Sequence, residues 1–241
     1  MAHEPRIILT RERERNRPWA AELALAGYGV LEMPLVRYEP LPVPVDFDGT
    51  GFDWILFTSP QGVAAFRSAG LDPGDARMAC LGDGTGAALA AAGWNDALGL
   101  QTRDGVEFAQ AFLATIQDPG RVLLPGPRRR MSEPRASLTT VGCEVRELAL
   151  YETVPVSANE LPSAPPASGD IVFFCSPSTV RAFAGAWSER PPCVAIGEST
   201  AAAAKAEGFP TSTALTPDLD AMVRAAGLDP YQKTAKPEIE S

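Results

Sequence analysis

Histidine is almost absent from this chain, since the single one, His3, lies at the extreme N-terminus. Nucleophile triads that depend on histidine and multi-histidine metal sites are therefore excluded as the basis of an activity. The four cysteines are widely separated, and none forms a Cys-x-x-Cys pair. We expect them to be buried, reduced thiols that pack as small apolar side chains. Any catalysis must rest on other groups.

Long apolar runs and a signal-peptide pattern are also absent. No stretch is long enough to cross a bilayer, and the start, MAHEPRIILTRERER, passes from a short apolar run directly into charge. A cytoplasmic location is the default expectation. The net charge of -9 disfavours nucleic acid as a partner, because phosphate binding needs a basic field. Two basic runs, at residues 11–17 and 128–130, are as consistent with solvated helix faces as with a local binding patch.

The chain contains an internal duplication. The matched segments are DWILFTSPQGVAAF (from Asp53) with DIVFFCSPSTVRAF (from Asp170), ACLGDGTGAALAAAGW (from Ala79) with VAIGESTAAAAKAEGF (from Val194), and RIILTRERER (from Arg6) with RVLLPGPRRR (from Arg121). An offset of 115 residues aligns Thr85 with Thr200, and one two-residue gap separates the copies at Ser59 and Ser176. A period of this length indicates a duplicated domain, and 241 residues suffice for two domains.

Each copy alternates continuous apolar runs with helix-like segments, which is typical of a parallel sheet covered on both faces. The predicted fold class is α/β, with two doubly wound parallel-sheet domains and a cleft between them. Two proline-rich segments, 38–49 and 151–168, are expected to be extended connectors that lie side by side. Residues 95–120, the other possible linker, contain the helix-like VEFAQAFLATI. We therefore favour a first domain that the chain leaves and re-enters.

These considerations predict the following boundaries: a discontinuous first domain from residues 1–37 plus 157–226, a second domain at 47–149, linker strands at 38–46 and 150–156, and a flexible tail at 227–241.

The duplicated strand-to-helix corners suggest an anion-binding function. Serine at a helix N-cap followed by proline starts a helix strongly, and in doubly wound sheets such starts lie at the carboxyl ends of strands, where ligands bind. Free N–H groups and the helix dipole favour anions there. The candidate binding residues are Thr10, Arg11, Ser59, Gly82, Thr85, Gly126, Ser176, Ser178, Gly197, Ser199 and Thr200. Plain helix capping explains any one corner equally well, but four at matched positions favour a ligand with many anionic groups.

In this order and spacing the motifs ILTR (from Ile8), MPL (from Met33), FTSPQGV (from Phe57), LGDGT (from Leu81), LYET (from Leu150), FCSPSTV (from Phe174) and AIGEST (from Ala195) resemble the uroporphyrinogen-III synthase family over about residues 6–223. The resemblance implies two α/β domains joined by two extended strands. It also implies a reaction in which linear hydroxymethylbilane, with eight carboxylates, loses water and closes with its last pyrrole ring inverted.

The resemblance also bears on individual residues, cofactors and partners. The family's important tyrosine falls at Tyr151, the candidate catalytic residue, and its important threonines fall at Thr85 and Thr200. The resemblance implies no metal and no organic cofactor. It implies a monomer, and the upstream bilane-forming enzyme is a candidate partner. The sequence departs from the family pattern at TRE, at Gly86 and in LPGPRRR, so the carboxylate contacts near residues 125–130 stay open.

Two alternatives remain at this stage. A two-domain α/β sensor could bind a ligand in the same cleft without turning it over. A Rossmann-type oxidoreductase would share the fold class, but the chain lacks the glycine fingerprint of that class. Tyr151 itself could be a strand aromatic that packs on the linker.

Overall fold

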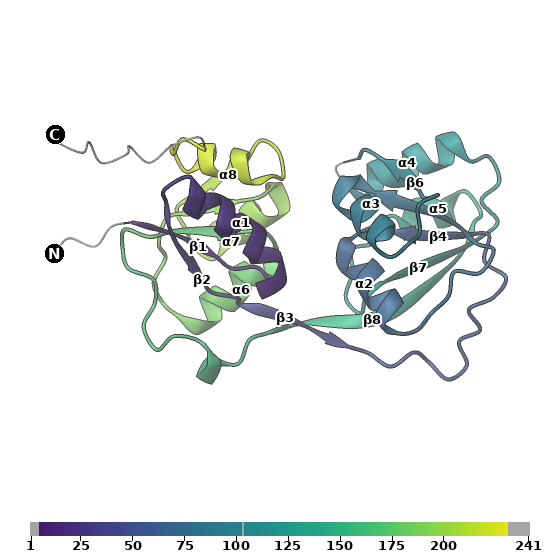
Figure 1. Ribbon diagram of the computed structural model, residues 1–241, viewed down its shortest axis with the longest axis horizontal. Helices are drawn as coiled ribbons and strands as arrows, with labels where there is room; N and C mark the ends of the chain where they lie inside the picture. The colour runs from purple at the N-terminus through teal and green to yellow at the C-terminus, as the bar shows by residue number, and fades with distance from the viewer. Residues whose placement is uncertain (1–4, 103, 231–241) are drawn as a thin grey trace, which may run out of the picture. The chain divides into compact units, whose positions relative to one another are not determined.

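The computed structural model describes residues 5–102 and 104–230, and its contacts divide the chain into two compact units (Figure 1). Unit 1 comprises residues 1–37 and 154–241, and unit 2 comprises residues 38–153. His3 and most of the expected flexible tail, 231–241, lie outside the described residues.

Unit 1 is built on a five-stranded parallel sheet with the order β11-β10-β9-β1-β2. Its elements are β1 (Arg6–Leu9), α1 (Arg13–Leu25), β2 (Gly29–Glu32), the 3-10 helix η1 (Ala158–Glu160), β9 (Ile171–Phe174), α6 (Pro177–Ala186), β10 (Cys193–Ala195), α7 (Glu198–Ala206), β11 (Thr211–Thr213) and α8 (Leu219–Ala225). The helices α6 and α7 pack their apolar side chains on one face of this sheet, and α1 and α8 cover the other. The central strands are therefore buried on both sides, as their continuous apolar sequences predict.

Unit 2 is built on a six-stranded sheet with the order β3-β8-β7-β4-β5-β6. Its elements are β3 (Val36–Pro40), β4 (Trp54–Phe57), α2 (Pro60–Ser68), β5 (Arg77–Leu81), α3 (Gly82–Ala91), β6 (Leu98–Leu100), α4 (Gly105–Thr115), β7 (Arg121–Pro127), α5 (Arg135–Thr140) and β8 (Glu144–Pro155). The strands from β8 to β6 are paired in parallel. The helices α2 and α3 cover one face, and α4 and α5 cover the other.

The chain passes between the units twice, within β3 and within β8. The two strands are neighbours in the sheet of unit 2. The Leu41 N–H donates to the Leu150 carbonyl, and the Val156 N–H donates to the Leu35 carbonyl. Because one residue number falls as its partner rises, the two strands run antiparallel. β8 is one strand of 12 residues that reaches deep into the sheet, so Leu150–Pro155 is its end and not a separate linker strand.

The predicted α/β class with two doubly wound sheets is confirmed: the sheet of unit 1 is parallel, the sheet of unit 2 is parallel from β8 to β6 with β3 antiparallel at its edge, and helices cover both. Some predicted local features differ from the structure. The run 128–130 is not on a helix face but lies between β7 and α5, whereas Arg13, Arg15 and Arg17 are exposed on α1. The alanine-rich helix α3 begins at Gly82, so Thr85 lies within its first turn.

Candidate functional site

In unit 1 the predicted binding residues lie at one edge of the sheet. The neighbouring strands β1, β9 and β10 are parallel, so their carboxyl ends lie at the same edge and lead into α1, α6 and α7. This edge carries Thr10, Arg11, Ser176, Ser178, Gly197, Ser199 and Thr200. The Thr10 hydroxyl donates to the Phe173 carbonyl at 2.7 Å and thereby ties the end of β1 to β9.

In unit 2 the equivalent edge carries the remaining predicted residues. The strands β4, β5 and β7 lead into α2, α3 and α5, and the residues at their ends are Ser59, Gly82, Thr85 and Gly126. Gly82 has a φ of 72°, in the left-handed region that favours glycine, whereas Gly197 has an extended backbone that any residue adopts. The backbone requirement at this corner is therefore specific to unit 2.

The helix starts at these edges are of two kinds. At α2 and α6 a serine cap is present: the Ser59 hydroxyl accepts from the Gly62 N–H at 3.1 Å, and the Ser176 hydroxyl accepts from the Thr179 N–H at 3.3 Å. At α3 and α7 no side chain caps the helix. At α3 and α7, therefore, no side chain of the helix start competes with an anion for the first-turn N–H groups.

The two uncapped starts each contain one of the threonines. Thr85 and Thr200 are only 3% and 2% exposed, and within the described part of the chain neither hydroxyl has a protein hydrogen-bond partner. The Thr10 hydroxyl, by contrast, donates its hydrogen bond to the protein itself. An acid, Asp83 or Glu198, also lies in each first turn and adds negative charge beside the site. Thr85 and Thr200 are thus the buried hydroxyls of the predicted set that no protein group in the described chain engages.

The arginines at these corners do not extend freely toward a ligand. The Arg11 guanidinium stacks on the Trp19 ring at 3.6 Å from its centroid and donates to the Arg15 carbonyl. Arg128 forms an ion pair with Glu152 at 3.0 Å. Arg130 is turned inward, because its side chain is only 19% exposed and bonds to the protein.

Tyr151, the candidate catalytic residue, lies on β8 and is 5% exposed. Its ring packs edge-on against Tyr38 of β3, with centroids 5.4 Å apart. Its carbonyl accepts from the Arg128 N–H at 2.8 Å, just beyond a bulge between Gly126 and Pro127. Tyr151 is therefore held within β8, between Tyr38 of β3 on one side and the Pro127 end of β7 on the other.

Sequence reasoning missed two polar side chains behind these corners, Asn16 on α1 and Arg130 after β7. Each donates to strand-end carbonyls. Asn16 was hidden within a charged run, and no motif marks it. The one feature of the sequence that could have identified Asn16 is that it is an uncharged amide within a run of charged residues in the first turn of α1.

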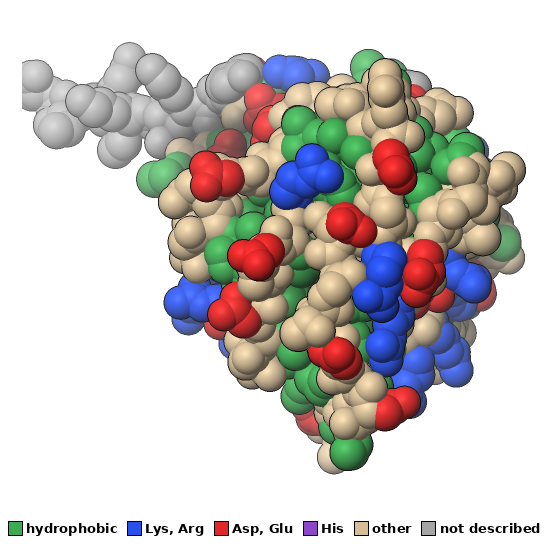
Figure 2. Space-filling model, turned by 90° about the vertical axis from the view of Figure 1, so that its right-hand side faces the viewer, with side chains coloured by type: hydrophobic (Ala, Val, Ile, Leu, Met, Phe, Trp, Pro, Cys, Tyr) green, Lys and Arg blue, Asp and Glu red, His purple; other side chains and the backbone are tan. Residues whose placement is uncertain are grey.

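The surface charge is mixed. On the face drawn in Figure 2, acidic and basic side chains are interspersed, and Lys and Arg side chains gather in one band. Across the described ranges, no group of three or more His, Cys, Asp or Glu side chains is placed to hold a metal ion. No helix in the part that the structure describes is both long and apolar enough to span a membrane.

Comparisons with known proteins agree on one family. Residues 17–224 match the family model described as "Uroporphyrinogen-III synthase HemD". The chain is 30% identical to a protein of rice (Oryza sativa subsp. japonica) named "Uroporphyrinogen-III synthase, chloroplastic", over 92% of this chain and 79% of that one.

Solved structures agree on the fold. The uroporphyrinogen-III synthetase of Helicobacter pylori superposes with a TM-score of 0.68 at 19% identity, covering 92% of this chain and 98% of that one. A mutant uroporphyrinogen III synthase of the thermophilic bacterium Thermus thermophilus gives 0.57 at 20% identity, covering 93% and 98%.

Proposed function

The chain belongs to the uroporphyrinogen-III synthase family, and we propose that its strand-end corners bind the carboxylates of hydroxymethylbilane. The protein is a cyclising lyase of tetrapyrrole biosynthesis and not a sensor of the same fold.

The observation that carries the binding proposal is the pair of uncapped helix starts at α3 and α7. Each offers first-turn N–H groups and a threonine hydroxyl with no protein partner among the described residues. A linear tetrapyrrole with eight carboxylates fits such donors, which bind anions without a full counter-charge. The capped corners of Ser59 and Ser176 then shape the surroundings, together with Gly82, Gly126, Gly197, Ser178 and Ser199. Thr10 and Arg11 support the end of β1.

We further assign Tyr151 as the acid of the reaction. The hydroxyl of hydroxymethylbilane leaves as water once it is protonated, because the adjacent pyrrole stabilises the carbocation that forms. The Tyr151 phenol donates that proton and recovers one when the terminal ring loses its own after ring closure. Since the linear compound is expected to close unaided to the uninverted ring, the larger task of the protein is to hold the terminal ring. Attack then comes from the substituted carbon, through a spiro intermediate that fragments and recloses inverted.

The proposal also covers the oligomeric state, the cofactors, the partner enzyme and the location of the protein. We propose that the protein acts as a monomer without metal or organic cofactor, and that the upstream bilane-forming enzyme hands over its product. A cytoplasmic location remains a prediction that requires its own test, because the rice relative is named chloroplastic.

The experiment that tests the function uses the purified full chain and enzymically generated hydroxymethylbilane. The products are oxidised and the isomers are separated by chromatography. We expect the inverted isomer to dominate with the protein and the uninverted isomer to dominate without it. The same isomer mixture with and without protein would reject the proposal.

A further inference from the structure

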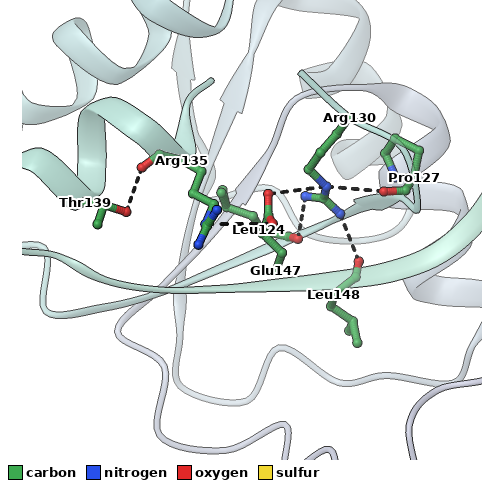
Figure 3. Close-up of polar contacts among 7 residues, drawn as sticks. All are labelled: Leu124, Pro127, Arg130, Arg135, Thr139, Glu147 and Leu148. Atoms are coloured by element: carbon green, nitrogen blue, oxygen red, sulfur yellow. Dashed lines mark hydrogen bonds and ion pairs between the residues drawn. The ribbon is translucent and has the colours of Figure 1, made fainter. Parts of the chain in front are cut away.

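The Arg130 side chain folds back onto the strand that precedes it (Figure 3). Its guanidinium donates to the Leu124 carbonyl at 3.0 Å, the Pro127 carbonyl at 3.2 Å and the Leu148 carbonyl at 3.3 Å. It also pairs with Glu147 at 3.5 Å. Burial lowers the pKa of the Arg130 guanidinium, and the Glu147 charge opposes this shift. The side chain thus joins the carboxyl end of β7 to β8.

The Asn16 side chain occupies the corresponding place in unit 1. It is fully buried, and its Nδ2 donates to the Leu9 carbonyl at 3.1 Å and to the Arg11 carbonyl at 2.8 Å. The offset of 115 that relates the two copies places Leu9 on Leu124. The carbonyl at this repeat position, at the end of β1 and in the middle of β7, therefore receives a side-chain hydrogen bond in both units. The donors are an amide and a guanidinium at neighbouring, not matching, repeat positions, because the offset places Arg130 on Arg15.

We propose that Asn16 and Arg130 are positioning residues with the same role, which hold the carboxyl ends of β1 and β7 in the geometry that binds and orients the substrate. This inference rests on the proposed function. Neither side chain needs to touch the substrate. Each fixes the path of the two or three residues that form the corner: Thr10 and Arg11 in unit 1, and Gly126 to Arg128 in unit 2.

The position of Arg130 links it to Tyr151. The guanidinium lies across Gly126, 3.4 Å from the place where a Cβ would stand. Two residues later the Arg128 N–H bonds to the Tyr151 carbonyl. Loss of the guanidinium frees the bulged segment between them, so the corner and the tyrosine no longer keep a fixed separation. A displacement of about 1 Å is enough to cost catalysis roughly 100-fold.

The test compares Arg130→Met, which keeps the apolar stem and removes every donor, with Arg135→Met. Arg135 pairs with the same Glu147, at 3.8 Å, and is more than half exposed. Asn16→Leu is compared with Glu22→Gln, a change at an exposed position of the same helix. For each variant we would measure kcat, KM and the ratio of inverted to uninverted product, at a temperature where circular dichroism shows the native fold.

For Arg130→Met and Asn16→Leu we expect kcat for the inverted product to fall by roughly 10- to 100-fold, with a larger share of uninverted product. Arg135→Met and Glu22→Gln should match the wild type, and Arg130→Lys should recover part of the loss. If Arg130→Met does not fold, Arg130→Lys is judged by the same criterion. Folded variants with wild-type kcat and isomer ratio, or an equal loss in Arg135→Met, would overturn the inference. A wild-type protein that makes no inverted product would reject the proposed function instead.

Discussion

The two units of this protein share one arrangement of strands and helices, but they differ in one edge strand and in the partners of their side chains. Read from β2 to β11 in unit 1 and from β8 to β6 in unit 2, the strands follow one order. The same pairs of helices cover the same faces, with α6 and α7 in unit 1 matching α2 and α3 in unit 2. Unit 2 adds β3 at the edge next to β8. The apolar pattern therefore determines the backbone, while side chains at equivalent positions have taken different partners.

The largest difference expected between the units concerns Tyr151. Its equivalent in unit 1, at the offset of 115, is Val36, so no phenol is repeated there. We expect Tyr151→Phe to lower turnover by about 100-fold or more, because general acid assistance typically supplies 10²- to 10⁴-fold. The product should still be the inverted isomer, because positioning is retained.

Tyr38→Phe is the matched control for this change, since it removes the hydroxyl of the ring that packs against Tyr151. Its turnover should stay close to that of the wild type. Full activity in Tyr151→Phe would show that the phenol is not the acid and that Tyr151 only packs against its neighbours. A mainly uninverted product would show that it shapes the site.

A second difference lies at the opposite ends of the strands, in an Asp–Arg pair that the repeat preserves. Asp170 is fully buried and accepts from the Arg6 N–H at 3.0 Å, the Arg6 guanidinium at 2.9 Å and the Ala167 N–H at 2.9 Å. The equivalent Asp53 is exposed and accepts from the Arg121 N–H at 2.7 Å, whereas the Arg121 guanidinium bonds to Glu144 and Gly51. The same two residue types thus form a buried pair in one unit and a solvated contact in the other.

We expect Asp170→Asn to lower the free energy of unfolding of unit 1 by about 2 kcal/mol, because the partly exposed Arg6 and two backbone N–H groups lose a fully buried charged acceptor. Asp53→Asn should cost unit 2 less than about 1 kcal/mol. Denaturant titrations of both variants measure the difference, and equal losses would contradict it. The hydrogen bond to Asp170 raises the pKa of Arg6, so the contribution of Arg6 ionisation is present below the ordinary arginine pKa and is lost as the pH rises through the raised pKa.

The fold could be predicted from the sequence because its signals are local and repeated. Continuous apolar runs identify buried parallel strands, and Ser59-Pro60 and Ser176-Pro177 mark the starts of α2 and α6. The proline-rich segments indicated extended connectors, and the structure places the unit boundaries within β3 and β8. These inferences need only the chemistry of short segments.

The side-chain partners could not be predicted in the same way. Arg128, Arg129 and Arg130 are identical in type and adjacent, yet two are exposed and one folds back onto β7 and β8. The serine corners and the threonine corners have the same small polar composition, but only the serines bond to their own helix. Whether a polar group bonds to the protein or stays available to a ligand depends on backbone geometry, which composition does not encode.

The smallest expected effect tests the threonine pair, where the two units are most alike. Thr85→Ala and Thr200→Ala each remove one neutral hydroxyl but leave the helix N–H groups in place. Each should therefore cost about 1 kcal/mol of substrate binding, a roughly fivefold rise in KM. If the two hydroxyls bind separate carboxylates, the double variant should show the product of the two effects, because independent contributions add in free energy. Ser59→Ala is the matched control, since its hydroxyl caps α2: it should lower stability by about 1 kcal/mol and leave KM unchanged. A wild-type KM in both threonine variants would remove these hydroxyls from the site and leave the backbone alone to bind the substrate.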